Sequence, residues 1–221
     1  SETAKPCVGR CAVTGVLPVI SAMGVECRIL PTAVLSNHTM FKKFTCKDLS
    51  DQIEPISDVW EMEGITFDGI YTGYLASIEQ CEQVCRFFDR FSTGDNLVLV
   101  DPAMADNGKL YAAFGPDFPE AMKKVCAKAD VIVPNITEAS LLTGMPYRTE
   151  YDESYIHELL ERLLELGCGT AALTGVSYEP GKLGVAYLDR SGKEFSYFTR
   201  KCEQSYHGTG ALYAYTVAGG R

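Results

Sequence analysis

The stretch Asn-Leu-Val-Leu-Val-Asp-Pro at residues 96–102 carries the pattern that decides the fold. Its four consecutive apolar residues, 97–100, predict a strand buried on both faces, because a strand with one face in water alternates apolar and polar side chains. The run ends abruptly at Asp101 and Pro102. A strand of this kind lies inside a sheet that has helices packed on both sides.

Helical and strand patterns alternate in the chain around this strand. Ser77 and Gln80 have the spacing of a capping box, which predicts a helix from Ser77 to about Phe91. Asp152 caps and Gly167 ends a second helix. The other elements predicted in this part of the chain are strands at 67–74, 129–133 and 169–173, and helices at 118–127 and 137–142. This alternation predicts parallel strands joined by right-handed crossovers, with helices on both faces of the sheet.

The N-terminal part of the chain shows weaker patterns. Apolar spacing predicts a helix over 8–24, which Pro18 kinks or delays. A partly β-branched segment predicts a strand over 27–35, and the polar residues 36–50 predict an exposed loop or flap.

Two further elements complete the predicted architecture. A helix is expected over 49–64, with Ser50 or Asp51 as its cap. Alternating polarity at 182–189 and 193–201, around a Ser-Gly turn, predicts an antiparallel hairpin.

The bulk composition is typical of a soluble globular domain. The chain has 221 residues, of which 46% are hydrophobic and 22% charged, and its formal net charge is −9. This charge argues against a basic face for nucleic acid or an anionic membrane, and no run of about 18 apolar residues could span a membrane. We therefore expect no nucleic-acid and no membrane partner. The nine cysteines are scattered and odd in number, which favours reduced thiols in a cytoplasmic protein over disulfides or a zinc site.

Polar or glycine residues follow several predicted strands at the point where each strand ends. They are Thr-Gly-Tyr at 72–74, Asp101, Asn135 and Thr174. Because the carboxyl ends of parallel strands meet at one edge of the sheet, where ligands bind in such folds, we expect a binding site there. The alternative is that these are ordinary polar loop residues.

A second candidate for ligand binding is Tyr-His-Gly-Thr-Gly-Ala at 206–211, which leads into an apolar, Ala-rich segment. The pattern predicts a loop that enters the N-terminus of a buried helix. Glycines let the backbone approach a ligand, and the first N–H groups of a helix lack intrahelical partners, so the turn could hold a phosphate. A Gly-x-Gly before a helix is also compatible with a simple tight turn.

Three carboxylates stand near these strand ends. Asp101 and Asp106 bracket a loop, and Glu138 opens a helix after the next strand. Carboxylates beside a nucleotide site would hold Mg²⁺ directly or through water. The competing interpretation makes Asp101 and Glu138 caps of a turn or a helix.

Five motifs, in this order, resemble the pyridoxal kinases of the ribokinase-like superfamily. They are residues 24–39, Tyr-Thr-Gly-Tyr at 71–74, residues 101–111 with Asp-Asn-Gly-Lys-Leu-Tyr, Val-Pro-Asn-Ile-Thr-Glu-Ala at 133–139 and His-Gly-Thr-Gly at 207–210. The resemblance implies an α/β, three-layer ribokinase-like fold, with a mainly parallel sheet between helices and an edge hairpin. It also implies transfer of the γ-phosphoryl group of ATP to the 5′-hydroxymethyl group of pyridoxal, pyridoxine or pyridoxamine, with Mg²⁺ and K⁺, in a homodimer.

The resemblance assigns roles to individual residues. Asp106 and Glu138 match residues near the metal, and Thr39 and Tyr74 match residues around the pyridine ring. The matching nucleotide-binding positions are Asp101, Asn135, Thr174, Gly208, Thr209 and Gly210. The matching catalytic positions, which form the anion hole and the base site, are Gly208, Gly210 and Ala211.

The chain departs from this family in three ways. The family follows its Gly-Thr-Gly motif with an Asp that accepts the substrate proton, and Ala211 stands here instead. The family's buried first strand is not recognisable in residues 1–6, and the family continues beyond the last helix of this chain. We expect a single domain over 1–221 that lacks the family's first strand and C-terminal helices. The alternatives are a hydroxymethylpyrimidine kinase, or a non-catalytic member that binds the nucleotide or the vitamin.

Overall fold

The computed structural model describes residues 5–6, 13–36, 43 and 45–201. Its main sheet has six strands in the order β11-β10-β9-β8-β5-β4. In this sheet β4, β5, β8 and β9 pair in parallel, and β10 pairs antiparallel with both β9 and β11. The strands are β4 (Gly69–Thr72), β5 (Leu97–Val100), β8 (Val131–Ile132), β9 (Thr170–Val176), β10 (Lys182–Asp189) and β11 (Glu194–Arg200). The predicted mainly parallel sheet with an edge hairpin is therefore confirmed.

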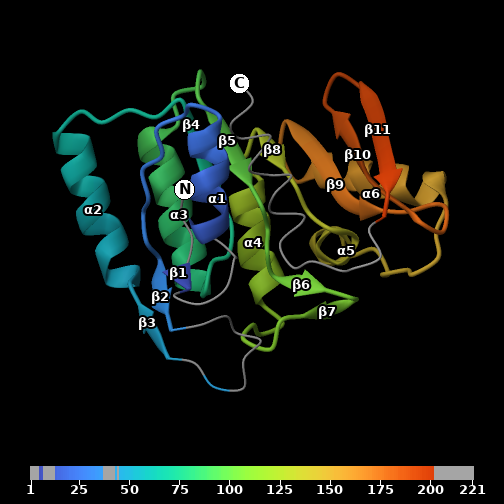
Figure 1. Ribbon diagram of the computed structural model, residues 1–221, viewed down its shortest axis with the longest axis horizontal. Coiled ribbons are helices and arrows are strands. Elements are labelled where there is room, and N and C mark those ends of the chain that lie inside the picture. The colour runs from blue at the N-terminus through green and yellow to red at the C-terminus, as the bar shows by residue number, and fades with distance from the viewer. Residues whose placement is uncertain (1–4, 7–12, 37–42, 44, 202–221) are drawn as a thin grey trace.

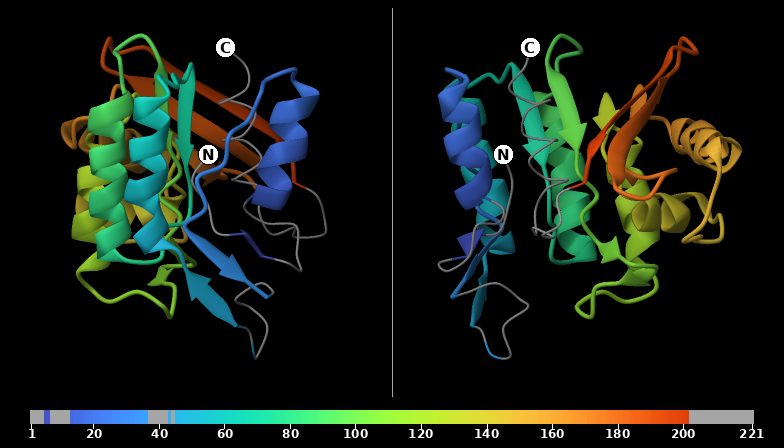
Figure 2. Two further views of the ribbon diagram at one scale, coloured as in Figure 1. Left: turned by 90° about the vertical axis from the view of Figure 1, so that its left-hand side faces the viewer. Right: turned by 45° about the vertical axis from the view of Figure 1, so that its right-hand side comes forward.

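Within the described part of the chain, helices cover the two faces of this sheet unequally. Figure 2 shows α1 on one side of the sheet, and α2 and α3 on the opposite side. The cluster of buried side chains that α3, α4, α5 and α6 share with the sheet is much larger than the one around α1. The helices are α1 (Val13–Ala22), α2 (Ser50–Met62), α3 (Ile78–Phe91), α4 (Phe118–Cys126), α5 (Ile136–Thr143) and α6 (Glu153–Glu165). The three-layer α/β architecture expected from the sequence is present.

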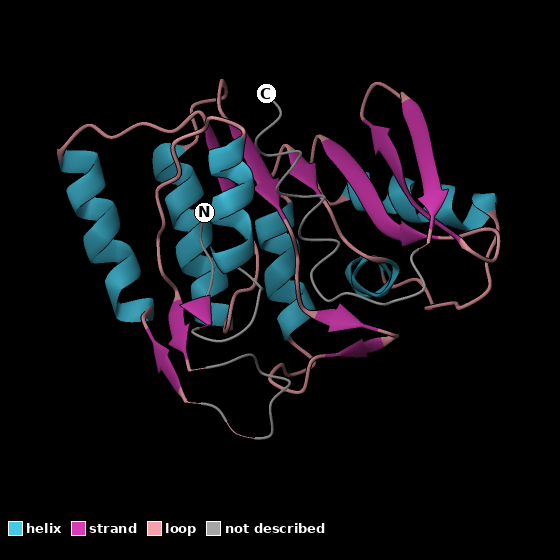
Figure 3. Ribbon diagram, viewed as in Figure 1, coloured by secondary structure: helices cyan, strands magenta, loops and turns pink. Residues whose placement is uncertain are grey.

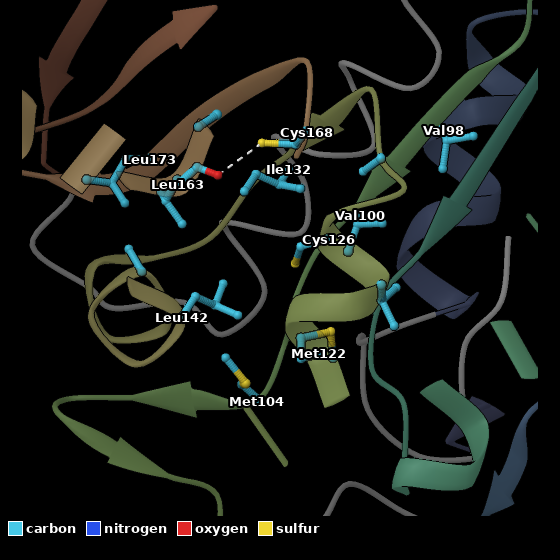
Figure 4. Packing of buried hydrophobic residues seen from close by; sticks show 14 of the residues in the cluster. Val98, Val100, Met104, Met122, Cys126, Ile132, Leu142, Leu163, Cys168 and Leu173 are labelled. Atoms are coloured by element: carbon cyan, nitrogen blue, oxygen red, sulfur yellow. Dashed lines mark hydrogen bonds between the residues drawn. The ribbon is translucent and has the colours of Figure 1, made fainter. Parts of the chain in front are cut away.

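Strand β5 lies in the interior, as the apolar run predicts. All four of its residues are buried, and alternate side chains enter different clusters. Val98 and Val100 face the α3–α6 side, where Ile132 and Leu173 join them (Figure 4). Leu99 faces the α1 side. A continuous apolar sequence is thus required because both faces of the strand are covered.

Most helix boundaries agree with the predictions to within two residues, but three strands differ. β8 spans Val131–Ile132, although residues 129–133 were expected. The strand expected over 27–35 is reduced to β2 (Ala33–Leu35), and β9 extends past its predicted end to Val176. Short strands are set by pairing with neighbours, which local residue patterns do not contain.

A small second sheet lies beside the main one in Figure 1 and has the order β1-β2-β3. β1 (Lys5–Pro6) pairs in parallel with β2, and β3 (Cys46–Asp48) pairs antiparallel with β2. The expectation of an uninterrupted loop over 36–50 is wrong at β3. All three residues of this edge strand are exposed, so no alternation of apolar and polar residues marks it.

The hairpin of β6 (Ala105–Asp106) and β7 (Lys109–Leu110) was not predicted. Its turn is Asn107-Gly108, and both residues have positive φ, 51° and 76°. Asn-Gly is the preferred pair for a two-residue turn of this hand. The signal was therefore in the sequence, although the flanking strands are only two residues long.

The helix caps confirm some predictions and correct others. Ser77 accepts the Gln80 amide at α3, and Asp152 accepts the Tyr155 amide at α6, as expected for N-caps. Gln80 does not close the predicted capping box, because its side chain accepts the amide of Ala76 instead. Neither predicted residue caps α2: its N-cap is Leu49, without a side-chain hydrogen bond.

The described cysteines lie in both buried and exposed places. Five of them within these ranges are free thiols, namely Cys46, Cys81, Cys85, Cys126 and Cys168. Cys126 and Cys168 lie inside the core, where Cys168 donates to the Leu163 carbonyl (Figure 4). Across the part of the chain that the structure covers, none of the helices has the length and apolar character needed to cross a bilayer.

Gly184 offers a test of the edge hairpin. The register of β10 against β9 shifts between Gly184 and Val185. A Cβ at Gly184 would lie 2.1 Å from the Tyr197 carbonyl oxygen, so Gly184→Ala must push β10 and β11 apart. We expect the free energy of unfolding in urea to fall by about 2 kcal/mol.

Gly115→Ala is the control, because no heavy atom lies within 4 Å of its Cβ position, and it should change stability by less than about 0.5 kcal/mol. Equal stabilities of the two variants would contradict the packing of this hairpin.

Candidate functional site

The carboxyl ends of β4, β5, β8 and β9 meet at one edge of the main sheet. In Figures 1 and 3 this edge lies on the side of the β6–β7 hairpin and the small sheet. The backbone joins neighbouring strand ends directly: the Asp101 amide donates to the Thr72 carbonyl at 2.8 Å. Asn135 and Thr174 form a parallel bridge. The structure therefore brings together the strand-end residues that the sequence singled out.

Asn135 and Glu138 form a complete capping box at the start of α5. Asn135 Oδ1 accepts the Glu138 amide at 2.9 Å, and Glu138 Oε2 accepts the Asn135 amide at 2.8 Å. The competing interpretation of Glu138 as a helix cap is thus correct. Capping alone does not explain its burial, because the side chain is only 3% exposed.

The first turn of α5 also holds the segment that follows β5. Glu138 Oε1 accepts the Met104 amide at 3.1 Å. Asn135 Nδ2 donates to the Ala105 carbonyl at 2.9 Å, and the Thr137 hydroxyl accepts the Gly108 amide at 3.0 Å. Three polar side chains at the start of α5, those of Asn135, Thr137 and Glu138, therefore fix residues 104–108, which carry Asp106.

Packing and backbone geometry support the same segment. Met104 is fully buried, in the cluster that contains Met122 and Leu142 (Figure 4). At Gly108 a Cβ would lie 2.7 Å from the Tyr147 ring, and φ is 76°, so glycine suits this position for two reasons. The loop after β5 is consequently anchored at both of its ends.

Asp101 is the second carboxyl group at the centre of the site. Removal from water raises the pKa of Asp101 to about 7, although a hydrogen bond from the Tyr71 hydroxyl to Oδ2, at 3.2 Å, acts in the opposite direction. Burial also raises the pKa of Glu138, and the charge of Asp101 raises it further. A buried carboxyl group whose ionisation is opposed by a second carboxyl group favours a bound cation or a bound proton.

Asp106 occupies a different environment, at the turn of the β6–β7 hairpin. Its side chain is exposed and accepts the Asn107 amide at 2.8 Å and the Asn107 side chain at 3.0 Å. Burial raises the pKa of the Tyr111 phenol, and the carboxyl groups of Glu138, Asp106 and Asp101 raise it further in that order. The electrostatic effect of all three carboxyl groups therefore reaches one phenol.

The residues present fit a hard cation such as Mg²⁺. Its preferred ligands are carboxylate and carbonyl oxygens, and one or two protein carboxylates are sufficient when phosphates and water supply the rest. Asp101 and Glu138 accept hydrogen bonds without an ion-pair partner in the described ranges. No group of three His, Cys, Asp or Glu with the spacing of a metal site occurs among the described residues, so this is not a closed protein cage.

Tyr74 lies two residues beyond the end of β4. Its ring packs against Ala33 and Leu35 of the small sheet and lies 5.5 Å from the Phe114 ring, between centroids. Burial raises the pKa of its phenol. A half-buried aromatic ring between the two sheets is suited to contact with a flat ligand.

The remaining predicted site residues divide into two groups. Thr174 is 7% exposed, and its hydroxyl donates to the Pro134 carbonyl at 3.3 Å. The others lie outside the described residues: Thr39, Gly208, Thr209, Gly210 and Ala211. Two residues that the sequence analysis gave no role, Tyr71 and Thr137, contact Asp101 and the Gly108 amide. Both stand inside the quoted motifs, but only the fold shows what their hydroxyl groups touch.

Comparison with known proteins gives a consistent result. The model of the phosphomethylpyrimidine kinase family matches residues 17–220. A pyridoxal kinase of Histophilus somni is 27% identical over 186 residues, which cover 80% of this chain and 58% of the relative. A hydroxymethylpyrimidine/phosphomethylpyrimidine kinase of Bacillus subtilis is 26% identical over 189 residues, covering 83% and 66%. This chain spans 58–65% of the length of several curated pyridoxal kinases.

Solved structures agree with the sequence relatives. A protein of Bacteroides thetaiotaomicron assigned as a phosphomethylpyrimidine kinase, crystallised with pyridoxal, has a TM-score of 0.92 and 34% identity, covering 99% of this chain and 78% of its own. The pyridoxal kinase of Lactobacillus plantarum gives 0.89 and 32%, with the same coverage. A complex of the Leishmania donovani pyridoxal kinase with ADP and pyridoxamine shares the fold at 20% identity, with a TM-score of 0.86 and coverage of 99% and 80%.

The raised pKa of Asp101 predicts a pH-dependent stability. Its folded-state pKa of about 7 lies above the unfolded value of 3.8, so the folded protein holds this proton more tightly. Ionisation of Asp101 therefore lowers the free energy of unfolding as pH rises from about 4 to about 7. Asp101→Asn cannot ionise and should be stabilised relative to the unaltered protein at pH 8 by about 2–3 kcal/mol more than at pH 5.

Urea unfolding in the presence of a chelator measures this difference. Asp106→Asn is the matched control, since its side chain is exposed, and it should change the free energy of unfolding by less than about 0.5 kcal/mol at both pH values. A stability difference for Asp101→Asn that does not vary with pH would refute the assignment.

The hydroxyl of Thr137 offers a test of the clamp on residues 104–108. Thr137→Val preserves the shape but leaves the Gly108 amide without its acceptor, which should cost about 1–3 kcal/mol and speed hydrogen exchange at Gly108. Thr137→Ser should restore slow exchange. Thr143→Val, on the same helix, removes a hydroxyl that donates to the Ala139 carbonyl and should leave Gly108 unchanged. Unaltered exchange in Thr137→Val would show that this hydrogen bond does not hold the hairpin.

Proposed function

This chain belongs to the phosphomethylpyrimidine kinase family. Because the chain is also similar to pyridoxal kinases in sequence and structure, we propose that it phosphorylates vitamin B6. The γ-phosphoryl group of ATP is transferred to the 5′-hydroxymethyl group of pyridoxal, pyridoxine or pyridoxamine. The proposal includes K⁺ as a second cation, a homodimer and a cytoplasmic location, all carried over from the family resemblance. It treats residues 1–221 as one domain.

The observation that carries the proposal is the cluster at the strand ends. Asp101, Asn135 and Glu138 lie at the ends of neighbouring parallel strands. Burial raises the pKa of both carboxyl groups, and the charge of Asp101 raises the pKa of Glu138 further. Phosphoryl transfer relies mainly on positioning and on stabilisation of charge, and less on covalent participation by the protein. A fixed set of oxygen ligands beside an open strand edge supports that chemistry.

In the proposed arrangement, Asp101, Asn135 and Thr174 bind the nucleotide together with Gly208, Thr209 and Gly210. Asp106 and Glu138 would hold Mg²⁺, which neutralises charge on the phosphates during transfer. The backbone N–H groups of the glycine turn would bind the transferred phosphate.

Tyr74 and Thr39 are proposed to contact the pyridine ring. The position of Tyr74 against β2 supports this, because its side chain then lies between the end of β4 in the main sheet and the small sheet. The 5′-hydroxymethyl group would point from there towards Asp101.

Ala211 has no group that can accept a proton from the attacking hydroxyl. Binding needs the backbone of the glycine turn, which alanine leaves in place, so substrates should bind while turnover is slow. A general base typically contributes about 10²–10⁴-fold to a rate.

A second candidate is phosphorylation of a hydroxymethylpyrimidine. The family description and the B. subtilis relative favour it. Both rings are flat heterocycles with a hydroxymethyl group, so Tyr74 could stack on either. A third candidate is a member that binds its ligands without turnover, which Ala211 favours.

The test compares turnover of pyridoxal and of 4-amino-5-hydroxymethyl-2-methylpyrimidine with Mg·ATP, in the unaltered protein and in Ala211→Asp. We expect pyridoxal to be the better substrate. We expect Ala211→Asp to raise its kcat by at least about tenfold, at the cautious end of the range for a general base.

Ala211→Asn is the matched control, because it has the shape of aspartate but cannot take a proton, and its kcat should stay unchanged. A preference for the pyrimidine would favour the second candidate. Binding of both ligands without any gain in Ala211→Asp would favour the non-catalytic candidate.

A further inference from the structure

Gln80 is a fully buried polar side chain that the proposed chemistry does not use. It lies in the first turn of α3, with 0% of its surface exposed. A buried amide is costly unless both its oxygen and its nitrogen find partners. The partners of Gln80 come from three separate segments of the chain.

The amide nitrogen of Gln80 donates to the chain just before β2 and just after β3, the two strands that form the base of the flap. Nε2 donates to the Thr32 carbonyl at 3.1 Å, immediately before β2, and to the Ser50 hydroxyl at 2.9 Å, shortly after β3. The Ser50 hydroxyl in turn donates to Asp48 Oδ1, which lies 3.5 Å from Nε2. Hydrogen bonds from Ser50 hold the pKa of Asp48 below its usual value, in keeping with a carboxylate acceptor.

The amide oxygen of Gln80 binds the loop after β4. Oε1 accepts the Ala76 amide at 2.8 Å, two residues beyond Tyr74. A capping-box glutamine would return to the amide of its own N-cap, Ser77, so this longer reach is a departure from simple capping. One side chain thus spans from the loop of Tyr74 to the base of the flap.

The two regions joined by Gln80 also touch each other directly. Tyr74 packs against Ala33 and Leu35 of β2, and Ala33 and Leu35 pair with Asp48 and Cys46 of β3. Any shift of the flap base relative to the loop after β4 therefore changes the surface on which the Tyr74 ring rests.

We propose that Gln80 is a positioning residue that sets the flap base against the Tyr74 loop and thereby controls affinity for the ring substrate but not for the nucleotide. The assignment of Tyr74 to the ring rests on the proposed function. Gln80 acts through Ala76, Thr32 and Ser50. Within the described residues, its side chain makes no hydrogen bond to Asp101 or Glu138.

Gln83 provides a matched control on the same helix. It is nearly as buried, at 6% exposed, and its Nε2 donates to the Ser50 carbonyl at 2.9 Å. Its hydrogen bonds in the described residues do not reach Thr32 or Ala76. Loss of Gln83 therefore removes one buried contact to the flap without releasing the Tyr74 loop.

The experiment measures binding of pyridoxal and of Mg·ATP by calorimetry in Gln80→Met and Gln83→Met, with hydrogen exchange of both variants. Methionine keeps the length of glutamine and removes its hydrogen bonds. Gln80→Met should raise the Kd for pyridoxal about tenfold, leave the Kd for Mg·ATP within about twofold, and speed exchange at Ala76 and Leu49.

Gln83→Met should leave both Kd values within about twofold and exchange at Ala76 unchanged. If Gln80→Met does not fold, Ser50→Ala removes one acceptor and should raise the pyridoxal Kd about threefold.

Each contrary outcome has a distinct meaning. Equal weakening of pyridoxal and Mg·ATP in Gln80→Met, or an unchanged pyridoxal Kd, would overturn the inference. Failure of the unaltered protein to bind pyridoxal would overturn the proposed function and the part of the inference that concerns the ring. In that case, slow exchange at Ala76 in Gln80→Met would also overturn the link between the loop and the flap.

Discussion

The buried carboxylate of Glu138 is the constraint on which the site depends. Its two oxygens accept amides from two different segments, at Asn135 and at Met104. A carboxylate removed from water is costly unless such bonds are made, so the start of α5 and the loop after β5 are held in one arrangement. Asn135 and Thr137 reinforce that arrangement through Ala105 and Gly108. The geometry of Asp106 follows from these contacts.

The third residue after the N-cap has a similar structural role in α5 and in α3. Glu138 and Gln80 each stand three residues after the N-cap of their helix, at α5 and at α3. Glu138 closes its capping box and uses its second oxygen on the next loop, whereas Gln80 omits the N-cap amide and spans three segments. The start of α5 therefore holds the loop that follows β5, and the start of α3 holds the base of the flap. Because the two clamps share no residue, a change at one of them should have little effect on the other.

The sequence predicted the architecture better than the contacts, for a physical reason. The apolar run of β5 and the caps Ser77 and Asp152 are local patterns, and the structure confirms them. β3 is an exposed edge strand without an apolar pattern, and it was interpreted as loop. The strand-end positions of Asp101 and Asn135 followed from the alternation of elements, but the bond from Tyr71 to Asp101 joins residues 30 positions apart. Such contacts depend on the packed fold and leave no local signal.

The pair of Asp101 and Glu138 links the stability of the fold to occupation of the site. Burial raises both pKa values, so the folded chain without a cation either retains a proton or carries unfavourable negative charge. A cation that binds there relieves this cost and, by mass action, stabilises the folded state. The same charge that opposes folding of the free protein therefore favours binding of a cation over binding of a free anion. Residues that lower stability in this way persist where a ligand offsets their cost.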